Sequence, residues 1–383
     1  MKFKLEDICS YYKKKVEVSN LTLETYVSTE NMLPNKIGVV YASSLPSTKS
    51  TQAFEEGDIL VSNIRPYFKK IWKAKFNGGC SNDVLVFKAN ENIDSDFLYY
   101  VLADDAFFTY AMASSKGTKM PRGDKTSIMQ YEVPDYDVSI QKKIARILKR
   151  IDDKIELNNK INNNLEEQAR ALFRNFVDNS SKTDKISIED IVLTANTGAD
   201  AIRKAPIVDH DTGIRCVRVG DMSNKRSFHD WGYAKVTKEV FDRYQLRKND
   251  IIVTRTASLG LNMIVPDDLQ AVYNNGLIRL SIDSKKALPL FIYRQIQTQD
   301  FSNYIARIES ETSVRPNMKI NYLLKYNFDL PSLEEQYNLI NLLQPMIESQ
   351  TALITENNGL NKLRDTLLPK LMSGEIDVSN ISI

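Results

Sequence analysis

Two clusters of basic side chains are the residues of this chain best suited to bind a phosphate-bearing partner. Residues 62–75 carry five Lys or Arg side chains and no acid, interleaved with three aromatic rings; residues 114–125 carry four basic side chains against one acid. Lys and Arg neutralise phosphates, whereas Arg, Asn and Ser can also reach the edges of bases. We favour nucleic-acid contact for the clusters together. For any single lysine the stronger interpretation is a solvated strand face, with Phe68, Ile71 or Trp72 turned inward.

The second half of the chain carries DNA-capable polar side chains at positions that an internal repeat makes equivalent, in residues 254–258 and 313–319. The residue types differ between the halves, as two loops that bind different half-sites require. The candidate DNA-binding residues are Ser62, Asn63, Arg65, Tyr67, Lys69, Lys70, Lys116, Lys119 and Arg122 in the first half, and Arg218, Arg255, Thr256, Ser258, Arg315, Asn317 and Lys319 in the second.

Catalytic chemistry, by contrast, has no recognisable set of residues in the sequence. The two histidines, His210 and His229, belong to no HExxH motif, and no pair of cysteines has zinc-ligand spacing. The sequence contains no GxxxxGK(S/T) loop, no glycine-rich nucleotide fingerprint and no Asn/Asp-Pro-Pro-aromatic signature of adenine methyltransferases. We therefore predict no catalytic residue, no metal site and no cofactor bound by this chain, and expect a binding protein.

The elements that must position these residues occur twice along the chain. A colinear series of sequence matches indicates this internal repeat. Leu5–Ile8 matches Ile188–Ile191 at an offset of 183 residues, and Gly57–Ser62 matches Asn249–Thr254 at an offset of 192. Farther along, Phe97–Tyr99 matches Phe291–Tyr293 at 194, and Pro121, Tyr131 and Gln141 match Pro316, Tyr326 and Gln336 at 195. The offset rises in one direction, as small loop insertions in a duplicated unit would produce.

Each repeat predicts a mixed α/β domain followed by a long helix. Short runs rich in β-branched residues, at 59–64 and 83–89 and again at 251–256 and 277–282, predict strands. Helical stretches are expected at about 96–113 and 289–308, and longer helices at about 139–177 and 332–373. The predicted fold class is α+β, a tandem repeat of two α/β domains, each followed by a long helix.

The two long helices share one apolar seam with alternating 3-4 spacing, which is typical of a coiled coil. We expect them to pair antiparallel, which relates the two repeats by an approximate two-fold axis; two independent amphipathic helices are the alternative. Asn162 and Asn357 fall at equivalent seam positions, where polar residues set register, although a hydrated hinge explains them equally well. The predicted seam is Ile144, Leu148, Ile151, Ile155, Asn158, Asn162, Leu165, Ala169, Leu172 and Phe176, and then Leu339, Leu343, Met346, Gln350, Leu353, Asn357, Leu360, Arg364, Leu367 and Leu371.

Local signals mark the ends of these helices. Ser332 and Glu335 form a capping box at the start of the second helix, and Ser139 is the matching cap candidate of the first. Pro345 removes a backbone hydrogen bond, so we expect it to kink or restart the second helix.

The chain resembles the specificity subunits of Type I restriction-modification systems over nearly its whole length. The resemblance rests on the order of variable domain, long helix, variable domain, long helix. It also rests on Asp329–Gln336 at the second helix entrance and on Leu367–Ile376 near the C-terminus. The entrance to the first helix, Val133–Gln141, departs from the family's proline-leucine run, and no Gly-Thr precedes Pro316.

The resemblance implies target-recognition domains at 1–138 and 179–331, a central spacer helix at 139–178, and a C-terminal spacer helix and tail at 332–383. Each domain would recognise one half of a bipartite, asymmetric site in double-stranded DNA. The helices would dock two modification (methyltransferase) subunits and, through them, restriction (motor-nuclease) subunits. S-adenosylmethionine, ATP and Mg would be bound by those partners and not by this chain.

Composition leaves two other classes of protein open. The net charge is only +2, so the position of the basic residues matters more than their total. A coiled-coil scaffold with two protein-binding modules, or a DNA enzyme with an unrecognised site, remain the alternatives. Three widely spaced cysteines and the lack of a long apolar run lead us to expect a cytoplasmic location and no membrane span.

Overall fold

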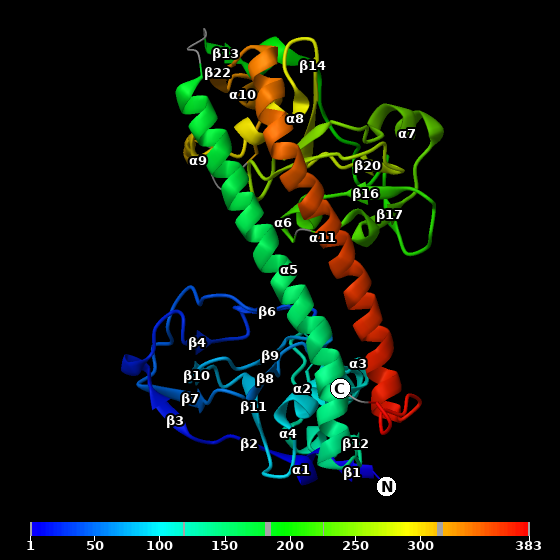
Figure 1. The fold of residues 1–383 in the computed structure, drawn as a ribbon. Coiled ribbons are helices and arrows are strands. Elements are labelled where there is room, and N and C mark those ends of the chain that lie inside the picture. The colour runs from blue at the N-terminus through cyan, green and yellow to red at the C-terminus, as the bar shows by residue number, and fades with distance from the viewer. Residues whose placement is uncertain (1, 118, 181–184, 225, 312–316, 382–383) are drawn as a thin grey trace. The chain divides into compact units, whose positions relative to one another are not determined.

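The computed structural model describes residues 2–117, 119–180, 185–224, 226–311 and 317–381, and it divides into two compact units (Figure 1). Unit 1 joins Met1–Lys160 to Leu353–Ile383, and unit 2 is Ile161–Ala352. Each unit therefore combines one α/β globular part with half of each long helix. The predicted fold class is confirmed, whereas the predicted domain boundaries stay a prediction.

A four-stranded antiparallel sheet lies at the centre of unit 1, and both of its faces are buried. Ile59 and Val61 pack toward the helices, whereas Leu60 between them packs toward a second sheet. This explains why the strand reads as a continuous apolar run rather than an alternating one. The central strands are β2 (Cys9–Tyr11), β8 (Ile59–Ser62), β9 (Ile71–Lys73) and β11 (Val84–Ala89), in the order β2-β11-β8-β9.

Unit 2 repeats this central sheet strand for strand. Its strands have the same order and the same antiparallel pairing, and Ile251 and Val253 face the helices while Ile252 faces the second sheet. They are β14 (Val192–Thr197), β18 (Ile251–Thr254), β19 (Asn262–Ile264) and β21 (Leu277–Ile282), in the order β14-β21-β18-β19. All four sequence runs predicted as strands lie in these two sheets.

The second sheets of the two units have different strand orders. In unit 1 the strands are β3 (Lys15–Glu17), β4 (Tyr26–Val27), β7 (Ser50–Phe54) and β10 (Gly78–Cys80), in the order β3-β7-β10-β4. In unit 2 they are β15 (Ile207–Val208), β16 (Arg215–Val217), β17 (Gly232–Ala234) and β20 (Ala271–Tyr273), in the order β15-β17-β16-β20. The last strand in sequence lies inside the sheet in unit 1 and at its edge in unit 2.

Short helices and hairpins complete each unit. In unit 1 these are β1 (Lys2–Lys4), α1 (Leu5–Ile8), β5 (Met32–Leu33), β6 (Gly38–Val39), α2 (Ser95–Ala103), α3 (Asp105–Ala113), α4 (Lys125–Ile128) and β12 (Glu132–Pro134). In unit 2 they are β13 (Lys185–Ser187), α6 (Val219–Ser223), α7 (Lys238–Tyr244), α8 (Pro289–Gln295), α9 (Gln299–Glu311), α10 (Ile320–Leu324) and β22 (Asn327–Asp329). The pairs β1–β12 and β13–β22 bring the start of each globular part beside the segment that enters a long helix.

The two long helices are α5 (Val138–Asn179) and α11 (Leu333–Ser373). The Ser332–Glu335 capping box is confirmed, with the Glu335 carboxylate accepting from Ser332 N at 2.9 Å and Oγ at 2.8 Å. At α5 the predicted cap is wrong: Asp137 Oδ1, rather than Ser139, accepts from the backbone N–H of Ile140 at 2.9 Å. Pro345 was predicted to kink or restart the second helix; α11 runs through it as one helix, so the helix does not restart there, and the kink stays a prediction.

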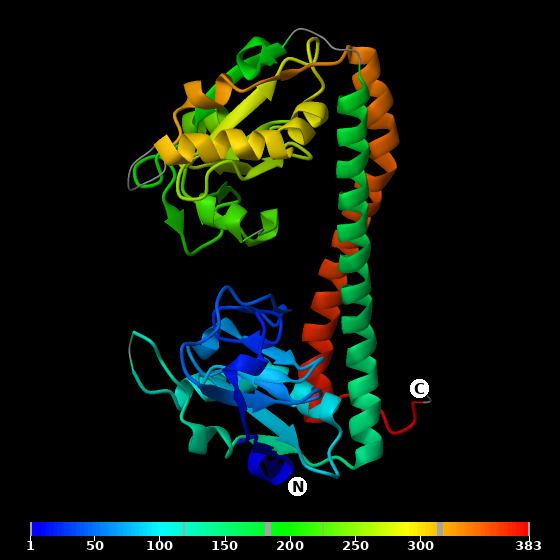
Figure 2. The same cartoon turned by 90° about the vertical axis from the view of Figure 1, so that its left-hand side faces the viewer.

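The helices lie side by side and antiparallel in each unit (Figures 1 and 2). In unit 1 Asp152 pairs with Arg364 and Asn158 with Asn357, and in unit 2 the backbone oxygen of Asn162 accepts from Gln350. The partner number falls as the residue number rises, which defines antiparallel packing. Buried seam residues are Ile144, Leu148, Ile151, Asn158, Ala169, Leu339, Leu343, Asn357 and Leu371, and half-buried ones are Ile155, Asn162, Leu165, Phe176, Met346, Gln350, Leu353, Leu360, Arg364 and Leu367.

The seam departs from the predicted register near the end of α5. Leu172 is 38% exposed, whereas its neighbour Phe173 is 2% exposed and packs on Phe291 of α8. The inward stripe therefore runs Leu165, Ala169, Phe173, because this end of the helix also packs against the globular part of unit 2. A single-partner heptad could not anticipate this second neighbour.

A buried glutamine ties each globular part to the helix that follows it. Gln141 Oε1 accepts from Asp94 N at 2.9 Å while Gln141 Nε2 donates to Tyr136 O at 2.8 Å. Gln336 makes the same two bonds in unit 2, to Leu288 N and Pro331 O, both at 2.8 Å. These two glutamines occupy equivalent positions in the repeat. Because both side chains are buried, their amide groups need hydrogen-bond partners within the protein.

Candidate nucleic-acid interface

The structure brings together the two loops of unit 1 that the sequence predicts as DNA contacts. The loop after β8 forms a bridge in which Ile64 pairs antiparallel with Arg122, and Arg65 N donates to Pro121 O at 2.8 Å. Lys116 and Arg122 also pair antiparallel with each other, and these two residues form the base of a small hairpin. Segments more than fifty residues apart in the sequence thus form one surface.

Unit 2 repeats the arrangement with different side chains. Thr256 pairs antiparallel with Asn317, and Met318 N donates to Arg255 O at 2.8 Å. The backbone also matches, because Arg65 and Ala257 both have left-handed conformations with φ of 50° and 63°. Counting from these bridges, Asn317 is the counterpart of Arg122, and Arg255 is the counterpart of Asn63.

The hairpin of unit 1 presents exposed cations held by acids. Arg122 Nε and Nη2 donate to the two carboxylate oxygens of Asp83 at 3.0 and 3.2 Å, and this hydrogen bonding raises the pKa of Arg122. Lys116 Nζ lies 3.0 Å from Asp124. The pKa of Asp124 is lowered to about 2, chiefly by the hydrogen bond from the backbone N–H of Ser127 and next by the hydrogen bond from Lys116. Lys119 is also exposed, so the hairpin carries cations that can contact phosphates or, at Arg122, a base edge.

Several predicted contact residues support the loop from beneath rather than face solvent. Ser62 is 3% and Asn63 is 6% exposed, and Ser62 Oγ donates to Ile64 O at 3.1 Å. Arg255 donates from Nε to Met318 O at 3.0 Å and from Nη1 to Asn275 O at 3.2 Å. Within the described residues, the buried Nε of Arg65 has no hydrogen-bond partner. Direct base contact by Ser62 or Asn63 is not compatible with this burial.

Two lysines of the first cluster are directed to the protein itself. Lys69 lies 2.6 Å from Asp105 of α3, and Lys70 donates to Thr29 O at 2.6 Å. Burial lowers the pKa of Lys70. Tyr67, at 49% exposed, packs against Phe68 with the rings tilted and their centroids 4.7 Å apart, and it remains available to a partner.

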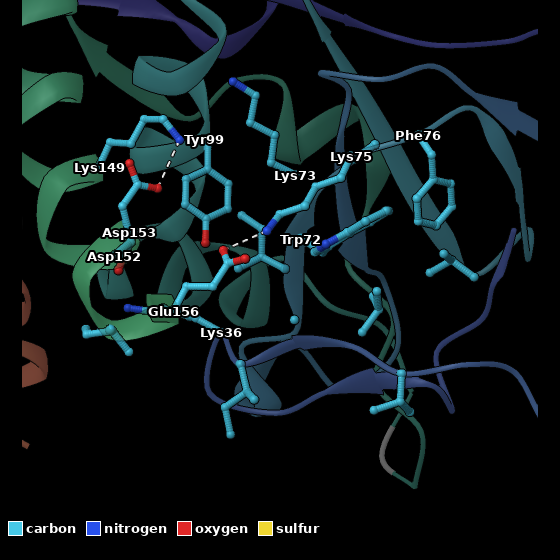
Figure 3. A pocket seen from close by; sticks show the side chains of 18 of the residues that line it. Lys36, Trp72, Lys73, Lys75, Phe76, Tyr99, Lys149, Asp152, Asp153 and Glu156 are labelled. Atoms are coloured by element: carbon cyan, nitrogen blue, oxygen red, sulfur yellow. Dashed lines mark hydrogen bonds and ion pairs between the residues drawn. The ribbon is translucent and has the colours of Figure 1, made fainter. Parts of the chain in front are cut away.

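The far end of the first cluster lines a cavity of about 1270 Å³ between the globular part of unit 1 and its own helices (Figure 3). Lys75 lies 2.7 Å from Glu156 of α5, and Lys73 lies 2.5 Å from Asp96 of α2. Hydrogen bonds from Lys75 and Lys160 lower the pKa of Glu156 to about 2. The predicted DNA surface therefore ends near residue 70, and the lysines beyond it hold β9 and the chain after it against helices.

In unit 2 the predicted contacts are exposed or half-buried. Ser258, Asn317 and Lys319 are exposed, and Thr256 is half-buried. Arg218 is half-buried and pairs with Asp221 at 3.3 Å, which pairs in turn with Arg226 at 3.1 Å. Arg315 lies outside the described residues. The sequence analysis missed Arg226, although the spacing Arg218-x-x-Asp221 after a β-type stretch was a usable signal.

Two kinds of feature are absent from the described ranges. No group of three or more His, Cys, Asp or Glu side chains there could hold a metal ion. No helix in that part of the chain has both the length and the apolar character needed to cross a membrane.

Comparison with known proteins gives one consistent answer. The model of the Type I restriction modification DNA specificity domain matches residues 1–167 and 181–362. The chain is 24% identical to the Type I restriction enzyme HindI specificity subunit of Haemophilus influenzae, over 98% of this chain and 99% of that one. It is also 24% identical to the MjaIX specificity subunit of Methanocaldococcus jannaschii, over 87% and 80%.

A solved structure shares the fold. The crystal structure of the S subunit of a Type-I restriction-modification system from M. genitalium superposes with a TM-score of 0.59, at 15% identity, over 97% of this chain and 96% of that one.

Proposed function

The chain belongs to the family of Type I restriction-modification DNA specificity domains, and on this premise we propose that each unit recognises one half of a bipartite, asymmetric DNA site. The chain is a specificity subunit, the non-catalytic recognition component of such a system. Unit 1 would bind through residues 62–70 and 114–125, and unit 2 through residues 254–258 and 313–319.

The observation that carries this proposal is the paired loop of the two units. Each unit presents a loop directly after an equivalent strand of the central sheet, β8 in unit 1 and β18 in unit 2. A β-bridge joins this loop to the segment that precedes a short helix, α4 or α10. The backbone is alike, but Arg122 in one unit is replaced by Asn317 in the other. Arg pairs best with guanine and Asn with adenine, so one scaffold with two side-chain sets supports two different half-sites.

The two long helices are the proposed docking surface for two modification subunits, and through them for the motor-nuclease. Large apolar side chains remain exposed on both helices: Leu157, Ile354 and Leu363 in unit 1 and Tyr337 and Leu342 in unit 2. Exposed apolar side chains of this size on a coiled coil support a protein interface. S-adenosylmethionine, ATP and Mg belong, in this proposal, to the partner subunits.

The proposal is tested by mapping methylation. The full chain is co-expressed with its modification subunit in a host without adenine methylation, and N6-methyladenine is located by single-molecule sequencing. We expect one asymmetric motif in two parts with a fixed gap, methylated on both strands. Soluble, co-purifying subunits that add no methylation would contradict it and favour the scaffold function.

Matched variants then assign the half-sites. Arg122→Ala should relax the motif in one half only, and Asn317→Ala in the other half only. The loss at the affected position should be about 5- to 150-fold in affinity, the size of one side-chain–base contact. If either variant changes both halves equally, the assignment of one unit to one half is wrong.

A further inference from the structure

Unit 2 holds two arginines at its surface with one buried carboxylate. Asp221, at the third position of α6, is 1% exposed. Its Oδ2 accepts from Arg218 N at 3.0 Å and lies 3.3 Å from Arg218 Nε, and its Oδ1 accepts from Arg226 Nη1 at 3.1 Å. The side chains of Arg218 and Arg226 are 38% and 48% exposed.

The carboxylate does more than cap a short helix. Its bond to Arg218 N accounts for the start of α6, but it does not account for two guanidinium groups. A buried carboxylate is costly unless paired, and here its partners are two side chains that reach solvent. The bond to Asp221 fixes the orientation of each arginine side chain, while the other N–H groups of each guanidinium can still donate to a ligand.

The unused donors point to a planar ligand. Arg218 uses Nε, so in the described residues both terminal nitrogens are without a hydrogen bond, and Arg226 keeps Nε and Nη2. Either pair of adjacent N–H groups forms a fork of the kind that donates to two acceptors in one plane. The O6 and N7 atoms of guanine in the major groove are such acceptors.

This arginine pair lies beside the DNA loop proposed above. A Cβ atom added to Gly276 would lie 2.8 Å from Val219 Cγ2, at the start of α6, and 2.9 Å from Thr256 Oγ1. The residue after Arg218 and the loop after β18 therefore converge on one glycine. Arg218 is thus one residue away from a contact with that loop, and Asp221 holds Arg226 beside Arg218.

Unit 1 is built differently at this place. Between the second and third strands of its second sheet, β4 and β7, the chain forms the short hairpin β5–β6. Between the corresponding strands of unit 2, β16 and β17, it forms α6 and the arginine pair. The cluster of Arg218, Asp221 and Arg226 is therefore a feature of unit 2, without a counterpart at this place in the described residues of unit 1.

We propose that Arg218 and Arg226 recognise guanine in the half-site of unit 2, and that Asp221 is the positioning residue that fixes both. The inference rests on the proposed function and adds the base type. It predicts at least one G·C pair in the half of the motif that Asn317→Ala alters.

The test compares methylation motifs and duplex binding of the assembled complex carrying Arg218→Lys, Arg226→Lys or Asp221→Asn. The lysine variants keep the charge and lose the fork. Each should relax one G·C position in the half-site of unit 2, with about 5- to 150-fold weaker discrimination against A·T at that position. Asp221→Asn should relax the positions of both arginines.

Two controls keep the result specific. Arg203→Lys, at another exposed arginine of unit 2, should leave the motif unchanged. Melting temperatures distinguish a misfolded Asp221→Asn protein from a mispositioned one, and the lysine variants decide the question even if that protein does not fold.

The inference would be overturned by a half-site of unit 2 without guanine, or by lysine variants whose motif and base discrimination match the wild type. Uniform weakening across all sequences would assign the arginines to phosphates and overturn it too. The two-part wild-type motif establishes the proposed function separately, so failure of one is distinguishable from failure of the other.

Discussion

Units 1 and 2 share a central sheet and differ in the sheet packed against it. In β2-β11-β8-β9 and β14-β21-β18-β19 every strand has a counterpart, whereas β10 lies inside its sheet and β20 lies at an edge. Each central sheet carries the bridged loop and also connects to helices, so two separate sets of contacts fix the register of its strands. The second sheets carry neither constraint. The comparison indicates that variation is tolerated in the layer farthest from the long helices.

The attachment of each globular part to α5 differs in chemistry as well. In unit 1 Tyr100 donates its hydroxyl proton to Asp152 at 2.8 Å, and Arg364 of α11 pairs with the same carboxylate. In unit 2 Arg294 of α8, 5% exposed, donates to both oxygens of Glu166 at 2.9 Å. One attachment ends in a neutral hydroxyl and the other in a buried charge.

Arg294→Met is therefore expected to give the largest effect. Among the described residues it leaves the half-buried Glu166 with Arg170 as its remaining partner, and the loss should be about 2–4 kcal/mol, toward the lower end of the range for fully buried pairs. Hydrogen exchange should report faster opening of α8 and α9, with unit 1 unchanged.

Tyr100→Phe is the matched change in unit 1. It removes one hydrogen bond to a carboxylate that keeps Arg364, so the loss should be about 1–2 kcal/mol. Equal losses in the two units would show that the charge of Arg294 adds nothing to the attachment.

The next effect separates two equivalent seam asparagines. Asn357 accepts from Asn158 Nδ2 at 2.8 Å and donates to Asn159 at 2.9 Å, whereas among the described residues the buried Oδ1 of Asn162 has no partner. Asn357→Leu should cost about 1–3 kcal/mol because it removes the bonds to Asn158 and Asn159 and leaves the buried Asn158 amide with Glu356, while Asn162→Leu should be neutral or stabilising. Chemical unfolding of both variants measures the difference, and a larger loss for Asn162→Leu would contradict the hydrogen-bonding pattern.

The smallest effect concerns acid. Asp124 caps α4 of unit 1 through the backbone N–H of Ser127, whereas Lys319 at the same place before α10 makes no side-chain cap. Since the folded pKa of Asp124 is lowered to about 2, its contribution is present above its ordinary value of 3.8 and is lost as the pH falls through about 2. Carboxyl NMR should show this low titration, and acid should loosen residues 116–128 before residues 317–324. Titration near 3.8 would rule out the cap.

Local sequence signals predicted much of this fold. The repeat, the central strands, the long helices and the Ser332–Glu335 cap all follow from patterns within a few residues or from the offset between copies. The failures have different causes. The predicted seam at Leu172 missed a second packing neighbour, because Phe173 packs against the globular part of unit 2. The predicted cap at Ser139 overlooked Asp137, which lies two residues earlier and accepts from Ile140 N.

The sequence predicted the loops of the candidate site better than it predicted which side chains in those loops are exposed. The four loops could be found from charge and from the repeat. Which cations face outward could not, because Lys69 meets Asp105 and Lys75 meets Glu156 only after folding. Arg226 was missed for the same reason, because it meets Asp221 only after folding, although the spacing Arg218-x-x-Asp221 was visible in the sequence.

The order of synthesis gives the discontinuous unit 1 a particular problem. Leu368, Leu371 and Val378 belong to its core, and Tyr136 donates its hydroxyl proton to Leu371 O at 3.1 Å. A ribosome adds about 5–20 residues per second, so on the order of 10–40 s pass while unit 2 is made. During that interval the first part of unit 1 has an open apolar groove, and the segment from Leu353 onward, which is translated after unit 2, closes it.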